Sequence, residues 1–182
     1  VKDSYTFDSF NIETSKQFAK AYAGARYSNE LETVLTVAFS DKRNLPSLRF
    51  SENKTVNLEE YTQKWVAAYL KGYDNRPSQR VGNKSNTYSD AIIKIILRSR
   101  LPNLSIELAN KIEGGHSLLM TIENIVGDLL EEYLSVKLSS CGWCCCWGST
   151  IDAVDFCKLD GSLLQVKNSD NSENSSSSRV RA

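Results

Sequence analysis

The stretch VDFCKLDGSLLQVKNSDNSENSSSS, residues 154–178, joins an alternating run to a tail built almost entirely of Asn, Ser and acids. Apolar and polar residues alternate on both sides of Asp160-Gly161, which predicts a β-hairpin. The preceding CGWCCCWGS, residues 141–149, also reads as a strand, so we expect three consecutive antiparallel strands. By composition the tail is typical of a disordered linker, because it has few apolar residues to bury.

The turn of the hairpin decides which side chains share a face. If the loop has three residues with Gly161 in the left-handed conformation, Lys158 pairs with Ser162 and Asp155 falls opposite Gln165. Asp155, Gln165 and Lys167 then lie on one face. A tight two-residue turn would instead place Asp155 opposite Val166 and separate the three polar groups.

The chain before residue 140 is predicted to be mainly helical, because apolar residues return every three or four positions. We expect an α+β fold, with a largely helical first half followed by a helix and the three strands. Gly114-Gly115 predicts a hinge, His116 a loop residue, and Ser117 the cap of a long helix. The expected helices cover residues 15–27, 29–39, 58–73 with Asn57 as the cap, 88–101 and 117–138.

An acid, an amide and a lysine on one face of a hairpin suit phosphodiester cleavage. A carboxylate binds a hard cation such as Mg²⁺, and the cation offsets charge that develops on the phosphate. A neighbouring lysine orients or deprotonates the attacking water. Asp155, followed after nine residues by Gln165-Val166-Lys167, has this pattern and resembles the PD-(D/E)xK nuclease superfamily.

The resemblance also covers the helix before the strands and the tail after them. The core of that superfamily begins with a helix that carries an acid, and ENIVGDLLEEYL, residues 123–134, matches it. Glu123, Gly127 and Glu131 are four apart and share one face. Glu131 or Glu123 would supply the carboxylate that is missing where Gln165 replaces the usual acid; the alternative is that these glutamates are solvated. Together with the tail, QVKNSDNSENSSSSRVR, residues 117–181 resemble the SinI-type type II restriction endonucleases.

That resemblance implies Mg²⁺-dependent cleavage of double-stranded DNA at a short, near-palindromic, GGWCC-like site within a restriction-modification system. It implies Asp155, Gln165, Lys167 and Glu131 as catalytic residues, with Glu123 as a further metal ligand. A two-fold symmetric site is normally cut by a homodimer. The tail would contact DNA through Asn168, Asn171, Asn174, Ser175, Arg179 and Arg181.

The chain departs from the pattern at its end, because the core should continue into a further helix and strand. We therefore expect a helical region at residues 1–114 and a catalytic core at residues 115–182 that is incomplete at its C-terminus. Either the chain is a fragment or another element closes the fold. The alternative function is a catalytically inactive DNA-binding or protein-interaction module derived from a nuclease.

Charge and cysteine content add weaker indications. The 22 basic and 22 acidic residues balance, but residues 76–111 carry seven basic residues against two acids, which would face either a polyanion or acids elsewhere in the fold. Cys141, Cys144, Cys145 and Cys146 lack a second, well-separated ligand pair, so we expect a buried strand and not zinc. Asp152 is the rival of Asp155 as a metal ligand. Without a disulfide pattern or a run of about 18 apolar residues, we expect a bacterial cytoplasmic protein that is not in a membrane.

Overall fold

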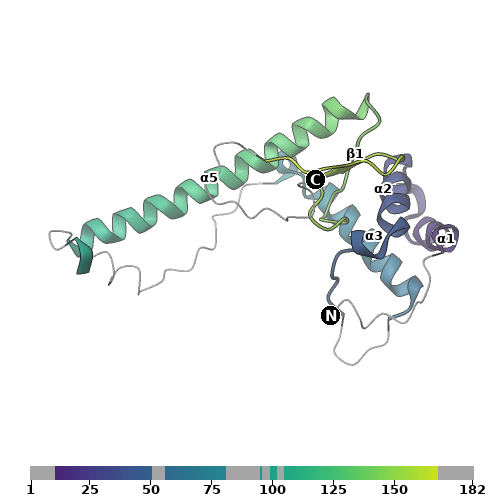
Figure 1. Ribbon diagram of the computed structural model, residues 1–182, viewed down its shortest axis with the longest axis horizontal. Helices are drawn as coiled ribbons and strands as arrows, with labels where there is room; N and C mark the ends of the chain where they lie inside the picture. The colour runs from purple at the N-terminus through teal and green to yellow at the C-terminus, as the bar shows by residue number, and fades with distance from the viewer. Residues whose placement is uncertain (1–10, 51–55, 81–94, 96–98, 102–104, 168–182) are drawn as a thin grey trace.

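The protein is described by a computed structural model that places residues 11–50, 56–80, 95, 99–101 and 105–167. Three helices, α1 (Ile12–Ala23), α2 (Asn29–Ser40) and α3 (Leu58–Asp74), gather on one side of a small antiparallel sheet, and the long helix α5 (Ile106–Ser139) lies on the other (Figure 1). The arrangement is α+β, as predicted. No helix among these residues combines the length and apolar character that a membrane crossing needs.

The first three helices begin at side chains that cap them. Asn11, Ser28 and Asn57 accept hydrogen bonds from the backbone N–H groups of Thr14, Leu31 and Glu60, at 3.1, 3.2 and 2.8 Å. The predicted helices at residues 15–27, 29–39 and 58–73, including the Asn57 cap, are therefore confirmed with shifted ends. α1 ends earlier than expected because Gly24 has a φ of +54° and the chain passes into a 3-10 turn, Gly24–Arg26.

The core is formed by one aromatic cluster. Trp65 and Tyr61 of α3 are fully buried, and both rings meet Phe39 of α2 edge to face, with centroids 5.6 and 6.0 Å apart. The indole N–H of Trp65 donates to the carbonyl of Thr150 at 2.8 Å, so α3 is joined directly to the segment between the first two strands. Burial of these rings is the main source of cohesion between the helices and the sheet.

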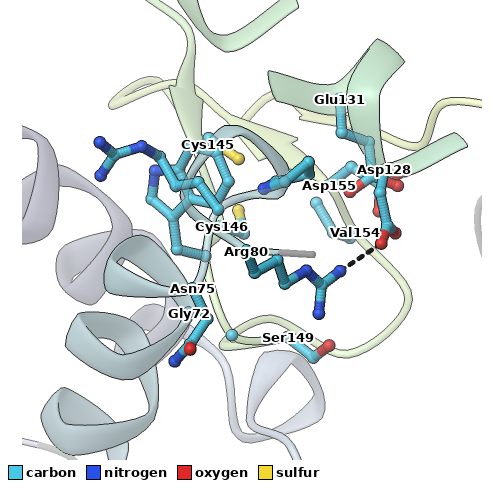
Figure 2. A pocket seen from close by; sticks show the side chains of 14 residues that line it. Gly72, Asn75, Arg80, Asp128, Glu131, Cys145, Cys146, Ser149, Val154 and Asp155 are labelled. Atoms are coloured by element: carbon cyan, nitrogen blue, oxygen red, sulfur yellow. Dashed lines mark hydrogen bonds and ion pairs between the residues drawn. The ribbon is translucent and has the colours of Figure 1, made fainter. Parts of the chain in front are cut away.

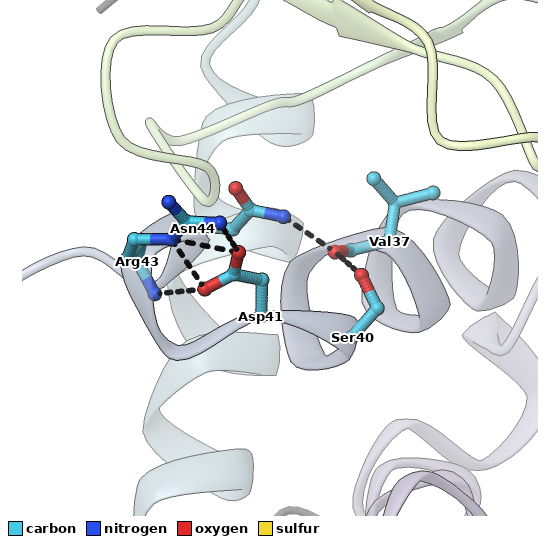
Figure 3. Close-up of polar contacts among 5 residues, drawn as sticks. All are labelled: Val37, Ser40, Asp41, Arg43 and Asn44. Atoms are coloured by element: carbon cyan, nitrogen blue, oxygen red, sulfur yellow. Dashed lines mark hydrogen bonds and ion pairs between the residues drawn. The ribbon is translucent and has the colours of Figure 1, made fainter.

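The turn after α2 also holds that segment. The side chain of Asn44 donates to the carbonyl of Val37 at 2.9 Å, while Asp41 binds the backbone and guanidinium of Arg43 (Figure 3). The carbonyl of Asn44 then accepts the N–H of Asp152 at 2.9 Å. Asp152 is exposed and does not line the cavity described below, so we do not retain it as the rival metal ligand.

Helix α5 is continuous over 34 residues and extends far beyond the rest of the described structure (Figure 1). The predicted hinge at Gly114-Gly115 is therefore wrong, as are the loop at His116 and the cap at Ser117. Ser105 caps the helix instead, through a 3.1 Å hydrogen bond from the N–H of Leu108. Each glycine costs about 1 kcal/mol in a helix interior, which long flanking helical segments can offset. An apolar seam whose residues are three, four or seven positions apart is exposed on α5: Leu108, Ile112, Leu119, Ile122, Val126, Leu129, Tyr133 and Val136.

The sheet has the predicted order of three antiparallel strands, but each strand is only two residues long. β1 (Cys144–Cys145) pairs with β2 (Phe156–Cys157), and β2 pairs with β3 (Leu163–Leu164). The strands are shorter than the alternating pattern predicts because the segment between β1 and β2 turns repeatedly. Gly148, Ser149 and Ala153 all have positive φ angles there.

Two glycines allow α3 to touch this segment. A Cβ atom on Gly148, whose φ is +73°, would lie 2.2 Å from the carbonyl oxygen of Ala68. A Cβ on Gly72 would lie 2.3 Å from the backbone nitrogen of Gly148. The backbones of α3 and of this segment therefore pack directly against each other.

Candidate active site

A cavity of about 300 Å³ lies between the end of α3, the sheet and α5 (Figure 2). The carboxylates of Asp128, Glu131 and Asp155 line it, together with the two basic side chains Arg76 and Arg80. The predicted catalytic residues Asp155 and Glu131 therefore lie close together, although Asp155 immediately precedes β2 and Glu131 lies on α5. Gly72 and Gly148 form part of the wall, so the close backbone packing helps to shape the cavity.

The hairpin has the turn that the catalytic interpretation requires. Gly161 has a φ of +88° and donates its N–H to the carbonyl of Lys158, and Lys158 donates to Ser162 at 2.9 Å. The predicted Lys158–Ser162 pair and left-handed Gly161 are confirmed. Asp160 closes the turn by accepting the N–H of Ser162 at 2.9 Å.

Asp155 directly precedes β2, and its N–H donates to the carbonyl of Leu164 at 3.0 Å. The observed pairs Phe156–Leu164 and Cys157–Leu163 have the register that the sequence predicts. The paired residues end there, so the pair expected between Asp155 and Gln165 stays a prediction. Here the carboxylate accepts the N–H of Val166 at 2.6 Å with Oδ2, and Oδ1 accepts no hydrogen bond from any described residue.

The two central carboxylates are held in a poorly solvated environment. Burial raises the pKa of Glu131 to about 7, and the nearby charges of Asp155 and Asp128 act in the same direction. Burial also raises the pKa of Asp155, although the Val166 N–H and the charge of Lys167 oppose the shift. Two such carboxylates beside each other fit a bound divalent cation, which would offset their mutual repulsion.

The other predicted ligands are less closely involved. Glu123 lies two turns before Glu131 on α5, and its half-buried carboxylate has one oxygen without a hydrogen-bond partner in the described part of the chain. Gln165 is half-buried, and no hydrogen bond joins it to Asp155. Within the described residues, no three His, Cys, Asp or Glu side chains cluster closely enough to hold a metal ion alone. A Mg²⁺ ion would accordingly keep water or phosphate oxygens in its shell, as it usually does.

Lys167 is exposed and close enough to Asp155 to influence its carboxylate electrostatically. The predicted DNA-contacting residues Asn168, Asn171, Asn174, Ser175, Arg179 and Arg181 lie outside the described residues. The acid and the lysine of the predicted motif are thus close in space, whereas the tail predictions are not tested.

The sequence did not single out Asp128 and Arg80, which form an ion pair in the cavity. Nearby, Arg76 lies 3.5 Å from the carboxylate of Glu132. These two basic residues of the 76–111 segment therefore face acids of α5, which is the second of the two alternatives that the charge pattern left open. The excess of basic residues was the available signal, but it did not identify their partners.

The cysteines pack as small apolar residues. Cys145, Cys146 and Cys157 are buried, and none of the five cysteines forms a disulfide. Cys146 and Cys157 belong to the main core, with Trp147 packed against it. Burial raises the pKa of the Cys145 thiol, which keeps it neutral. The predicted burial of the cysteines is confirmed for Cys145 and Cys146, whereas Cys144 is half-buried and Cys141 is exposed.

The amino-acid sequence is similar to those of known restriction enzymes. A model of the SinI restriction endonuclease family matches residues 15–182. The type II restriction enzyme Eco47I of Escherichia coli is 47% identical over 149 residues, which cover 79% of this chain and 62% of that enzyme. The type II restriction enzyme SinI of Salmonella infantis is 47% identical over 100 residues, which cover 52% of this chain and 43% of that enzyme. The aligned parts thus span less than two thirds of either relative.

Proposed function

Because this chain belongs to the SinI restriction endonuclease family, we propose that it is a type II, sequence-specific endonuclease that cleaves double-stranded DNA with Mg²⁺. The observation that carries the proposal is the convergence of Asp155 and Glu131 on one cavity, with the charge of Lys167 acting on Asp155. An acid pair with raised pKa values beside a lysine is costly to maintain unless it serves chemistry.

Asp155 and Glu131 would hold the cation, and the amide oxygen of Gln165 would supply a weaker ligand. Glu123 would join through its unpartnered oxygen or through water. When bound, Mg²⁺ supplies Lewis-acid stabilisation of the charge that builds up on the phosphate. The Val166 N–H fixes one oxygen of Asp155, so the other oxygen is left for the ion.

Lys167 would act on the attacking water. Its charge acts on Asp155, which supports a position for the ammonium group near the scissile phosphate. A lysine there orients the water and takes part in its deprotonation. The half-buried carboxylates keep the surroundings poorly solvated, which strengthens each of these electrostatic contacts.

The remaining parts of the proposal follow from family membership and residue type. We propose a GGWCC-like recognition site, a homodimer that matches a near-palindromic target, and a role in bacterial restriction-modification in the cytoplasm. The polar tail would supply base and phosphate contacts through the residues named above. Residues 115–182 would form the PD-(D/E)xK core and residues 1–114 a helical region, with α5 crossing from one to the other.

The alternative is a module that binds DNA or protein without cutting. Strands of two residues make a smaller sheet than the predicted nuclease core, and that observation favours the alternative. The two functions differ in a single property, which is whether the acid pair and Lys167 break a phosphodiester bond.

The test is cleavage of a mixed-sequence plasmid with and without Mg²⁺, using the protein and Lys167→Ala. We expect discrete fragments from the unmodified protein and a loss of rate of about 100-fold or more in the variant. Lys158→Ala is the matched control, because Lys158 lies 4.8 Å from the ring centroid of Trp143 and, unlike Lys167, is not among the charges that shift the pKa of Asp155. Retention on DNA without fragments, or equal rates for both lysine variants, would reject the proposed enzyme.

A further inference from the structure

The turn after α3 is fastened to α5 at one residue. Ser78, in the short 3-10 helix Pro77–Gln79, donates its N–H and its hydroxyl to the two carboxylate oxygens of Glu132, at 2.8 and 2.5 Å. Arg76 approaches the same carboxylate at 3.5 Å. Hydrogen bonds from Ser78 and the charge of Arg76 lower the pKa of Glu132 against the opposing effect of burial, so the fastening is ionic at neutral pH.

This fastening places Arg80 at the cavity. Its backbone N–H bonds to Pro77, and its guanidinium reaches the carboxylate of Asp128, one turn before Glu132 on α5 (Figure 2). Asp128 is the side chain with which Arg80 forms its ion pair in the described structure. The side chains of this pair are 42% and 43% exposed, so the guanidinium keeps donors that point to open space.

Arg76, the other basic residue of the cavity, is differently engaged. Its guanidinium stacks over the ring of Tyr73 at 4.1 Å and donates to the Tyr73 carbonyl at 2.8 Å. Together with the Glu132 contact, these interactions hold Arg76 against the wall. Arg80 is therefore the basic side chain of the cavity that can bind an incoming anion.

The charge balance of the cavity calls for such a cation. Three carboxylates line it against two guanidinium groups, so a DNA phosphate entering it would meet a net negative lining. A divalent ion on Asp155 and Glu131 reverses that balance, but it contacts the phosphate from one side only. An arginine fork on another side fits the equatorial phosphate oxygens, which carry the charge of the transition state.

We propose that Arg80 is a catalytic residue that binds a non-bridging oxygen of the scissile phosphate, with Asp128 holding the guanidinium in place until DNA arrives. The proposal rests on the proposed endonuclease function and assigns it a residue outside the acid, amide and lysine motif. Exchange of Asp128 for phosphate is cheap, because an exposed ion pair contributes only about 0–1 kcal/mol.

The experiment compares Arg80→Gln with Asp128→Asn by two readouts. The first is binding of a labelled GGWCC-containing duplex in EDTA across a series of salt concentrations. Loss of one phosphate contact should reduce the slope of log K against log salt by about 0.9 in Arg80→Gln. Asp128→Asn frees the guanidinium and should keep the slope of the unmodified protein. The second readout is cleavage with Mg²⁺, which should fall by about 10²–10³-fold in Arg80→Gln.

Several results would overturn the assignment. An unchanged salt slope in Arg80→Gln, or an equal loss in both variants, would mean that Arg80 acts only through its pair with Asp128. The absence of any DNA binding by the unmodified protein would overturn the assignment too, because Arg80 would then have no phosphate to contact. Matching circular dichroism and urea midpoints exclude unfolding of the variants. If the unmodified protein binds but never cleaves, the proposed function fails, whereas the salt slopes still decide whether Arg80 contacts phosphate.

Discussion

The segment between β1 and β2 has two sides with opposite character. Toward α3 it makes close contacts, because Gly148, at the edge of the cavity, lies against the backbone of Ala68 and the carbonyl of Thr150 accepts the indole N–H of Trp65. Toward α5 it borders a cavity in which Asp155 and Glu131 face each other. The packed side provides stability, whereas the cavity side holds charges that destabilise the metal-free fold.

The contrast predicts that substitutions on the two sides affect different properties. Changes on the packed side should lower the free energy of unfolding. Changes at the cavity should remove DNA cleavage while leaving stability equal or higher, as for engineered sites that relieve active-site strain. The following substitutions test this division, beginning with the largest expected effect.

Gly148→Ala should have the largest effect on stability. The new Cβ would overlap the Ala68 carbonyl, and the positive φ adds strain, so we expect a loss of about 3–5 kcal/mol. Gly142→Ala is the matched control, because Gly142 has a similar φ of +79° but nothing within 4 Å of the added atom. It should lose only about 1–2 kcal/mol. Urea unfolding followed by circular dichroism measures both values; equal losses would show that the close backbone approach is unimportant.

Trp65→Phe should have the next largest effect. Trp65 is fully buried, and the change removes its 2.8 Å hydrogen bond to Thr150 and leaves a small cavity. We expect a loss of about 2–3 kcal/mol in the free energy of unfolding. Trp143→Phe, at a half-buried position under Lys158, should lose less than about 1 kcal/mol. If the two variants unfold at the same urea concentration, the packed side does not supply the stability assigned to it.

The sequence predicts local features of the fold better than long-range contacts, for a physical reason. The Asn57 cap and the left-handed Gly161 depend on neighbours within a few residues, and both predictions are confirmed. The pairing of Arg80 with Asp128 joins residues 48 positions apart, so it depends on how the helices pack. The hinge predicted at Gly114-Gly115 is wrong because the helical segments on both sides offset the local cost of the two glycines.

The same limit applies to the site residues. Helical spacing places Glu123 and Glu131 on one face, but only the packing of α5 in the fold shows that Glu131 is the one whose charge couples to Asp155. The hydrogen bond from the Val166 N–H to the carboxylate of Asp155 likewise has no marker in the alternating pattern. The division at residue 114, the metal and the tail contacts stay predictions.

The smallest expected effect is the pH dependence of stability that arises from the buried carboxylate of Glu131. Since burial raises the pKa of Glu131 to about 7, the folded state holds its proton at pH 5 while the unfolded chain releases it from a pKa near 4.5. The stabilisation of the folded state by the proton on Glu131 is therefore complete at low pH and is lost as the pH rises through about 7. In EDTA, the protein should be less stable at pH 8 than at pH 5, with Glu131 contributing on the order of 1 kcal/mol after screening.

Glu131→Gln should remove that part of the pH dependence and raise stability at pH 8, while DNA cleavage is lost. Glu132→Gln is the control, because the pKa of Glu132 is lowered and its carboxylate stays ionised from pH 5 to pH 8. It should weaken the fastening to Ser78 equally at both values. Urea midpoints at the two pH values measure the difference, and Mg²⁺ at pH 8 should stabilise the unmodified protein more than Glu131→Gln. If Glu131→Gln keeps the full pH dependence, Glu131 does not supply the charge that distinguishes the two sides of the segment.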